Sequence, residues 1–320
     1  MTEQNNSTIH IFWKHYNTEK THKAHLPGNG RIPSWFSFEN CFLSLLDSIK
    51  DRHDVKVYLV MDSTDLENNF IYKYRDYYTL KLIDATVWND ENDELADQLA
   101  EEFPKRVLSS PTARHDPSIV LSKKLYPLPR DYVSIRETLK YMKSLNVQEN
   151  DRMFMCDNDY LFVTDWVDKV NILYKDYPNL TSKHYVCPMD LRHKYHFLHE
   201  DKLKDKITDN PRFNNFNLLA TGTKDEDLWK SGVLEKGHHH WMISTPTGPP
   251  HAIVTKSVFD EDFDIAYETV RDVPVWNRLH TEMNRLMISP LPGLSCHIMN
   301  RQLSPGVDWE KISTNYNTAS

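Results

Sequence analysis

The chain has 320 residues, of which 39% are hydrophobic and 12% aromatic, and its formal net charge is −8. This length and composition fit one large α/β domain with a substantial core, and they exclude a disordered or fibrous chain. The negative net charge gives no overall attraction to nucleic acid or to an anionic membrane, so a partner of that kind would need a local basic patch.

The N-terminal residues 1–8 are polar, so the sequence predicts no signal peptide ahead of the first apolar run. The longest apolar runs fall well short of the roughly 18 residues that cross a bilayer. The four cysteines, Cys41, Cys156, Cys187 and Cys296, form no CxxC pair, and three of them lie in apolar runs. Buried thiols in a reducing compartment are therefore expected, and with them a soluble cytoplasmic protein.

The first third of the chain alternates between strand-like and helix-like segments. Residues 9–13 predict a strand, 38–50 a helix that begins after the N-cap candidate Ser37, and 55–61 a second strand. This order is typical of a parallel α/β sheet, in which ligands gather at the carboxyl ends of the strands. Asp62 follows the second strand and is a candidate for contact with a ribose or base. Alternatively, it caps the next helix.

The remainder of the chain predicts further elements of the same fold. Helices are expected at 90–102 and 132–145, strands at 151–156, 186–189 and 253–258, and a Pro-rich surface segment at 109–130. We see no internal repeat and no linker. The sequence therefore predicts a single domain over 1–320, with surface insertions near 84–130 and 200–235.

The triplet Asp157-Asn158-Asp159 directly follows the strand expected at 151–156. Two carboxylates at the end of a buried strand are costly unless something positive joins them. Mg²⁺ and Mn²⁺ bind carboxylate oxygens and commonly complete their coordination with substrate phosphates. We therefore expect Asp157 and Asp159 to hold a divalent cation together with a nucleoside diphosphate. The simpler alternative is a turn, since Asp and Asn are common turn residues.

His297 lies far down the chain, after the turn at Pro292-Gly293. A histidine from a C-terminal segment can complete a metal site that has two acidic ligands. His297 is therefore the third expected metal ligand, although a single histidine is more often a surface or structural residue.

The segment 237–247 contains three adjacent histidines, then Trp241 and several hydroxyl side chains. Consecutive residues point in different directions and rarely bind one ion together, so zinc is not expected here. An aromatic face packs on the apolar side of a sugar ring while hydroxyls bond its edges. Trp241, Ser244 and Thr245 are therefore expected to line the sugar part of a binding site.

Several of these segments together resemble a group of small GT-A glycosyltransferases of bacteria and tailed bacteriophages. The similar segments are residues 31–41, 157–162, 240–254 and 288–312, and the last, with its Ser-Pro-Gly-Val-Asp-Trp run, is the most specific. The group shows Arg-Pro-Ser-Trp-Phe near its start, matched from Arg31 to Phe36 with an inserted Ile32. It often shows three acidic residues and then Tyr-Leu after the central strand, whereas here Asn158 replaces the middle acid. Its Trp-x-x-x-Pro-Ser/Thr stretch is similar to 241–247.

The resemblance implies an α/β, GT-A-like fold with a mostly parallel sheet flanked by helices. It implies a transferase that moves a hexose or pentose from a nucleoside-diphosphate sugar to an acceptor hydroxyl, with UDP as the commonest carrier and Mn²⁺ or Mg²⁺ as cofactor. Asp157 and Asp159 would hold the metal and the diphosphate, and His297 would approach them. The matched Arg31 and Trp35 would bind the donor.

The catalytic base is expected to be a carboxylate that takes the proton of the acceptor hydroxyl. Asp272 lies nearest to the position at which the group carries an acidic residue, and Asp190 follows a strand-like run and is a second candidate. Glu268 and Glu282 are competitors, and a helix-capping role for Asp272 is the alternative to catalysis.

The sequence defines the acceptor less closely. A bacterial setting suggests a surface glycan, and a phage setting suggests a hydroxymethylated pyrimidine in DNA, with the enzyme in the host cytoplasm. Basic and aromatic clusters at 123–124, 130, 192–199 and 202–206 are compatible with DNA, which we favour because no membrane-anchoring element is visible. The alternatives from other classes are a nucleotide-sugar hydrolase and a non-catalytic module that binds nucleotide sugars or glycans.

Overall fold

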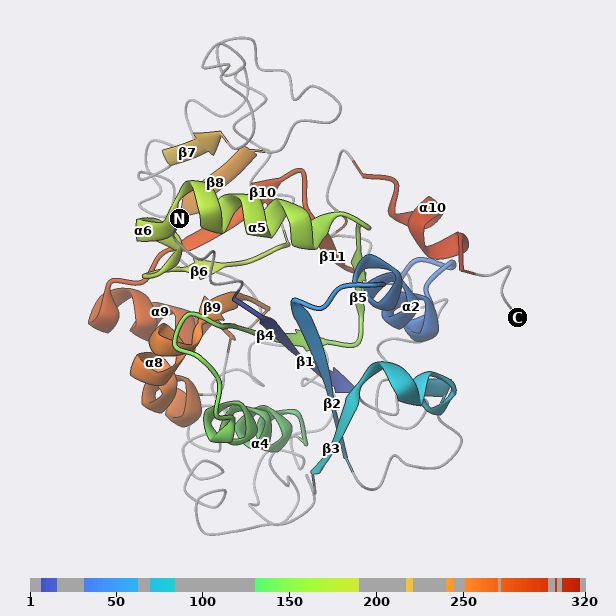
Figure 1. Cartoon of the computed structure of the whole chain (residues 1–320), viewed down its shortest axis with the longest axis horizontal. Coiled ribbons are helices and arrows are strands. Elements are labelled where there is room, and N and C mark those ends of the chain that lie inside the picture. The colour runs from blue at the N-terminus through green and yellow to red at the C-terminus, as the bar shows by residue number, and fades with distance from the viewer. Residues whose placement is uncertain are drawn as a thin grey trace, which may run out of the picture.

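The structure is a computed structural model that describes residues 7–15, 32–62, 70–83, 130–189, 217–220, 240–244, 251–269, 272–298, 303 and 307–316. In these residues helices flank a central sheet (Figure 1). The helix expected at 90–102 lies outside the described residues, and so does the surface segment at 109–130 except for its last residue.

Nine strands of the described residues form one sheet, in the order β3-β2-β1-β4-β9-β6-β10-β8-β7. They are β1 (Ile9–His15), β2 (Val55–Asp62), β3 (Thr79–Ile83), β4 (Arg152–Asp157), β6 (Tyr185–Val186), β7 (Asn217–Ala220), β8 (His240–Ser244), β9 (Ile253–Thr255) and β10 (Met287–Leu291). Only β8 and β9 run against the common direction. A separate two-stranded sheet pairs β5 (Tyr160–Phe162) with β11 (Ser295–His297). The expected mostly parallel sheet is confirmed.

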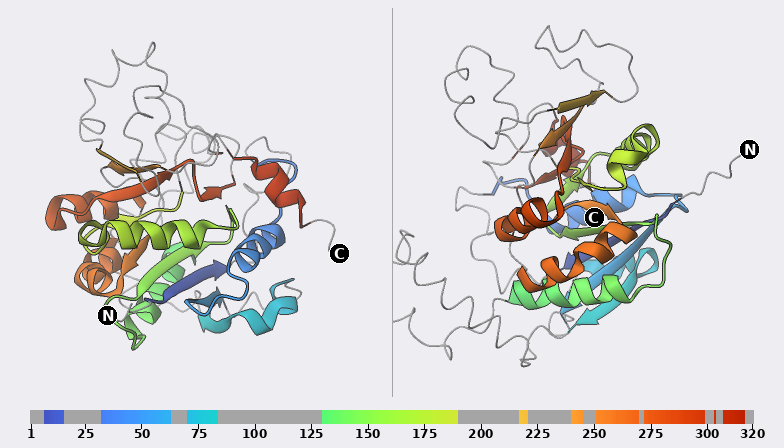
Figure 2. Two further views of the ribbon diagram at one scale, coloured as in Figure 1. Left: turned by 45° about the horizontal axis from the view of Figure 1, so that its top comes forward. Right: turned by 90° about the vertical axis from the view of Figure 1, so that its left-hand side faces the viewer.

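Helices cover both faces of the sheet. They are α2 (Phe38–Ser48), the 3₁₀ segment η3 (Phe70–Tyr77), α4 (Arg130–Ser144), α5 (Trp166–Asp176), α6 (Pro178–Thr181), α8 (Lys256–Thr269), α9 (Asp272–Met283) and α10 (Trp309–Thr314). On one face, Trp166 of α5 packs on Phe154 and donates its Nε1–H to Ser48 of α2 at 2.8 Å. On the other face, Tyr141 of α4 lies edge-on to Phe12, with ring centroids 6.0 Å apart. Figure 2 shows α8 and α9 beside α4 on that second face.

The strand β1 lies near the middle of this sheet and is buried along its whole length. Its sequence therefore has bulky apolar side chains at consecutive positions rather than at alternate ones, as is usual for a strand covered on both faces. Three ionisable side chains are buried with it, His10, Lys14 and His15. His10 lies between the Tyr58 hydroxyl, 3.1 Å away, and the Asp151 carboxylate, 3.3 Å away.

The predicted elements at 9–13, 38–50, 55–61, 132–145 and 151–156 are confirmed as β1, α2, β2, α4 and β4. The Ser37 side chain caps α2 by accepting from the Asn40 backbone N–H, as expected. The expected strand at 253–258 is wrong beyond Thr255. The backbone N–H of Lys256 donates to Asp151 and that of Ser257 to Glu149, which turns the chain out of the sheet and into α8.

One expected strand is shorter in the structure, and one expected insertion contains a strand. The strand expected at 186–189 ends at Val186, because Pro188 has no N–H to donate and its carbonyl instead accepts from Leu294 and Ser295, beside β11. The segment expected as an insertion near 200–235 contains β7, which forms the edge of the sheet. The expectation of an insertion itself stays a prediction.

All four cysteines are buried and free, which confirms the burial expected for those in apolar runs. Among the helices that the structure describes, none combines the length and apolar character that crossing a bilayer requires.

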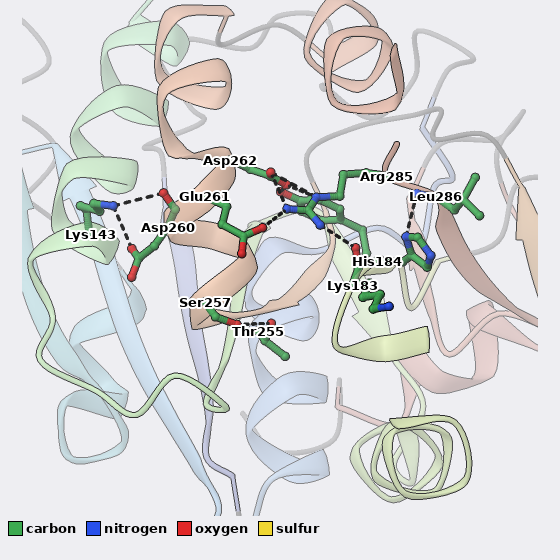
Figure 3. A network of polar contacts seen from close by, with 11 residues as sticks. Lys143, Lys183, His184, Thr255, Ser257, Asp260, Glu261, Asp262, Arg285 and Leu286 are labelled. Carbon is green, nitrogen blue, oxygen red and sulfur yellow. Dashed lines mark hydrogen bonds and ion pairs between the residues drawn. The ribbon is translucent and has the colours of Figure 1, made fainter. Parts of the chain in front are cut away.

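A buried ion-pair network ties α8 to the start of β10 (Figure 3). The Arg285 guanidinium donates to both oxygens of Asp262 at 2.9 Å, to Glu261 at 2.6 Å and to the Lys183 carbonyl at 3.0 Å. The Tyr185 hydroxyl donates to the same Asp262 carboxylate at 2.9 Å. The Asp262 side chain is only 1% exposed. Burial raises the pKa of Asp262, and its bonds from Arg285 and Tyr185 oppose that rise.

Candidate functional site

The carboxyl ends of β2, β1 and β4 meet at one edge of the sheet. Lys14 pairs in register with Val60 of β2 and with Asp157 of β4, so Asp62 and Asp157, the last residues of their strands, lie at the same edge. The side chain of Asp62 lies outside the described part of the chain. Ligands of open α/β sheets bind at this edge, which makes it the candidate site.

The first pair of charges at this edge joins Asp157 to Lys14. Neighbours in parallel register point to the same face, and the Lys14 Nζ lies 2.6 Å from the Asp157 Oδ1. The Lys14 side chain is 4% exposed, whereas that of Asp157 is 30% exposed. Since Oδ1 itself is buried, the exposed part of Asp157 is the rest of its side chain. Asp157 therefore turns one oxygen toward a buried cation and leaves its other side open to solvent.

The second pair joins Asp159 to His297, which lies 138 positions further along the chain. The antiparallel pairing of β5 with β11 places His297 opposite Tyr160, and the Ile298 N–H donates to the Asp159 carbonyl at 3.0 Å. These backbone bonds fix the side chains so that the His297 Nε2 lies 2.8 Å from the Asp159 Oδ2. The structure thus brings Asp159 of the triplet together with the distant His297, and the sequence singled out both residues.

A stack of three rings lies behind this second pair. The Tyr160 ring is parallel to that of His251 at 3.7 Å and to that of His297 at 5.1 Å. His251 is buried, and its Nε2 lies 3.0 Å from the Ser295 hydroxyl of β11. The stack restricts the orientation of the His297 ring, because rotation of that ring would break its packing on Tyr160.

Acidification should destabilise the fold through His251. Burial, reinforced by His297 and Lys14, holds the pKa of His251 well below its usual value of 6.5. In the unfolded chain His251 takes up a proton near pH 6.5, so the free energy of unfolding falls as the pH drops below that value. His251→Phe should reduce this pH dependence by up to about 1.4 kcal/mol per pH unit between about pH 5 and 6. Urea unfolding of both proteins across this range measures the difference, and equal slopes would contradict it.

The donor set at this edge fits a hard divalent cation. Two carboxylates and an imidazole are ligands that Mn²⁺ accepts, and Mg²⁺ commonly binds through one or two carboxylates plus substrate phosphates. No group of three His, Cys, Asp or Glu side chains in the described residues is placed to hold an ion without help. A cation here would thus use the open side of Asp157, the neighbouring Asp159 and oxygens from a ligand. The His297 Nε2 faces Asp159, so in this arrangement His297 would contact one of the two carboxylates that would hold the cation.

The two aromatic residues expected to bind the donor lie in different environments. Trp35 is partly buried, packs against the core, and its carbonyl accepts from the Ser313 hydroxyl of α10 at 3.2 Å. Through this bond the segment that resembles Arg-Pro-Ser-Trp-Phe lies against the C-terminal segment, the other end of the resemblance. Trp241 is fully buried in the hydrophobic core from β8, so its role in sugar binding stays a prediction.

The remaining candidates are only partly described. Asp272 is the first residue of α9 and Ser244 the last of β8, with both side chains outside the description. Arg31, Asp190 and Thr245 lie outside the described residues altogether. The competitors Glu268 and Glu282 both pair with Arg278 on the surface of α8 and α9, at 3.0 and 2.7 Å. Both carboxylates therefore belong to surface ion pairs.

The sequence reading overlooked Lys14, Tyr160 and His251. Lys14 had a usable signal, since a lysine stands near the end of a strand that is rich in bulky apolar side chains. His251 had none, because its position behind the site depends on the pairing of β9 with β4 and of β11 with β5.

Comparison with known proteins gives only distant similarity. No protein-family model matches the chain, and no curated protein matches it. Among solved structures, it is similar to S. aureus TarS 1–349, with 11% identity and a TM-score of 0.41 over 88% of this chain and 57% of that chain. It is also similar to the apo form of mouse xyloside xylosyltransferase 1, with 13% identity and a TM-score of 0.37 over 88% of this chain and 84% of that one. The chain thus spans little more than half the length of the first of these structures.

Proposed function

We propose that the chain is a glycosyltransferase that uses a nucleotide-sugar donor, with Mn²⁺ or Mg²⁺ held between Asp157, Asp159 and the diphosphate. The observation that carries this proposal is the Asp159–His297 pair, which lies two residues beyond Asp157, where β4 ends at the carboxyl edge of a mostly parallel sheet. The resemblance of the triplet and the C-terminal segment to GT-A glycosyltransferases supports it.

The proposed reaction is a substitution at the anomeric carbon of the donor sugar. The acceptor oxygen forms a bond to that carbon while the bond from the carbon to the diphosphate oxygen breaks, and the electron pair leaves with the diphosphate. A divalent cation held by Asp157 and Asp159 would neutralise charge on the leaving diphosphate. Asp157 and Asp159 orient the diphosphate end of the donor, and His297 holds the Asp159 carboxylate. A carboxylate such as Asp272 or Asp190 takes the acceptor proton.

UDP should stabilise the protein more strongly in the presence of Mn²⁺ than in its absence. At about 100 times its dissociation constant a ligand adds about 2.7 kcal/mol to stability, which raises the Tm of a chain of this size by about 5 °C. Thermal unfolding with UDP, Mn²⁺, both or neither measures the effect, and UDP-sugar hydrolysis or transfer is then followed by release of UDP. If UDP gives the same shift with and without Mn²⁺, the metal-dependent site is wrong.

The same preparation tests the acceptor. A hydroxymethylated pyrimidine of DNA is the acceptor that we favour, and its nucleosides should gain the mass of one sugar after incubation with UDP-sugars. The segments that suggested DNA lie outside the described residues, apart from the backbone of Arg130. A surface glycan as acceptor would leave the DNA unmodified, and binding without any turnover would favour the non-catalytic module.

A further inference from the structure

A buried lysine lies directly behind the acidic pair, and the proposed function does not use it. The Lys14 Nζ is 2.6 Å from Asp157, and the lysine side chain is 4% exposed. A side chain so thoroughly buried does not reach a substrate in the open part of the site. Any effect of Lys14 on binding therefore passes through Asp157 and through its own charge.

The charge of Lys14 changes the balance that an incoming cation meets. Asp157 and Asp159 supply two negative charges and Lys14 one positive charge, which leaves one net negative charge among the three. A divalent cation at the open side of Asp157 is also repelled by a buried ammonium group on the far side of the same carboxylate. Repulsion at such short range is poorly screened by salt, because the ammonium group is buried.

A nucleoside diphosphate adds negative charge to the single net negative charge of Asp157, Asp159 and Lys14. Its oxygens would add at least two charges and further ligands, so that cation and diphosphate each make the other's binding more favourable. By thermodynamic linkage the two effects are equal in size. The factor by which the diphosphate raises the affinity for the cation is the factor by which the cation raises the affinity for the diphosphate.

We propose that Lys14 makes cation binding at Asp157 and Asp159 conditional on the diphosphate, by holding the affinity for the free cation low. Lys14 is thus a positioning residue that acts through Asp157. This role rests on the proposed function, because it requires a site that takes a diphosphate and a divalent cation together.

The experiment compares the wild-type chain with Lys14→Met, Lys14→Gln and Lys14→Arg. Binding of Mn²⁺ alone is titrated by calorimetry or by the EPR signal of free Mn²⁺, and UDP affinity is measured with and without Mn²⁺. Both neutral variants should bind Mn²⁺ alone on the order of tenfold more tightly than wild type, because the repelling charge is gone. The factor by which Mn²⁺ strengthens UDP binding should fall to a similar extent, whereas Lys14→Arg should resemble wild type in both.

Lys256→Met is the matched control. Lys256 is also a buried lysine that pairs with an aspartate, Asp260 at 2.5 Å. It begins α8 beside the start of β4, whereas Lys14 lies beside the end of β4. Its loss should affect stability without changing either Mn²⁺ titration or the coupling to UDP. Lys14→Gln removes the charge but keeps a hydrogen-bond donor toward Asp157. It therefore tests the effect of charge even if Lys14→Met disturbs the site.

The outcomes separate the inference from the proposed function. If folded Lys14→Met and Lys14→Gln bind Mn²⁺ no more tightly than wild type, or more weakly, the inference is overturned even when wild-type UDP binding depends on Mn²⁺. If wild-type UDP binding does not depend on Mn²⁺, the proposed function fails, and the inference about Lys14 fails with it.

Discussion

Asp159→Asn should lower the rate of sugar transfer on the order of 10³-fold while the chain stays folded. The substitution removes one of two negative charges from the proposed cation site and keeps the size of the side chain. The amide oxygen can still accept from the His297 Nε2, which now lies 2.8 Å from the carboxylate. The expected loss is therefore one of charge at the site and not of the pairing between β5 and β11. Steady-state kinetics at several Mn²⁺ concentrations, with urea unfolding of the same preparation, would measure it.

A change at Asp157 is harder to interpret, because Asp157→Ala would also remove the carboxylate that pairs with buried Lys14. Asp168→Asn is the better control for Asp159→Asn. Asp168 pairs with Arg52 at 2.5 Å on α5, and its side chain is 63% exposed. Its loss should change neither the rate nor the response to Mn²⁺. Full activity in Asp159→Asn, with an unchanged response to Mn²⁺, would exclude a direct role of this carboxylate.

The elements that could be predicted are those whose structure depends on residues close together in the sequence. The apolar run of β1, the helical spacing after the Ser37 cap and the acidic ending of β4 each depend on neighbouring residues, and each was confirmed. The position of Asp157 and Asp159 after a buried strand was predictable for the same reason. The approach of His297 to Asp159 was expected from general metal-site chemistry and from the resemblance, and not from a local pattern, because the two residues are 138 positions apart.

What escaped prediction depends on register and on contacts between distant segments. The residues that lie beside Asp157 are set by the parallel alignment of β1 with β4, which makes Lys14 its neighbour. A shift of that alignment by one residue would turn Lys14 to the other face. The end of β9 at Thr255 was missed because the bonds that end it come from the segment before β4. Apolar residues at 258 and 259 continue the strand pattern and suit the buried side of a helix equally well.

The buried network at Arg285 should dominate the stability of the half of the sheet that lacks the site. Asp262→Ala should lower the free energy of unfolding by about 3–5 kcal/mol, because it removes one partner of a buried ion pair. Arg285, whose side chain is 8% exposed, would lose three bonds to Asp262, and the buried Tyr185 hydroxyl would lose its acceptor. Glu261 would remain 2.6 Å from Arg285, which favours the lower end of that range. Urea unfolding monitored by circular dichroism would give the value.

Two comparisons show whether the loss comes from the buried charge. The double substitution Asp262→Leu with Arg285→Met should lose much less than Asp262→Ala alone, because replacing both partners of a buried pair by apolar groups is often neutral. Glu282→Ala removes an exposed partner of Arg278 on α9 and should leave the unfolding midpoint unchanged within error. A loss below about 1 kcal/mol in Asp262→Ala would mean that water or Glu261 replaces the missing carboxylate. A double variant as unstable as Asp262→Ala would instead point to packing around Tyr185, and not the ion pair, as the source of stability.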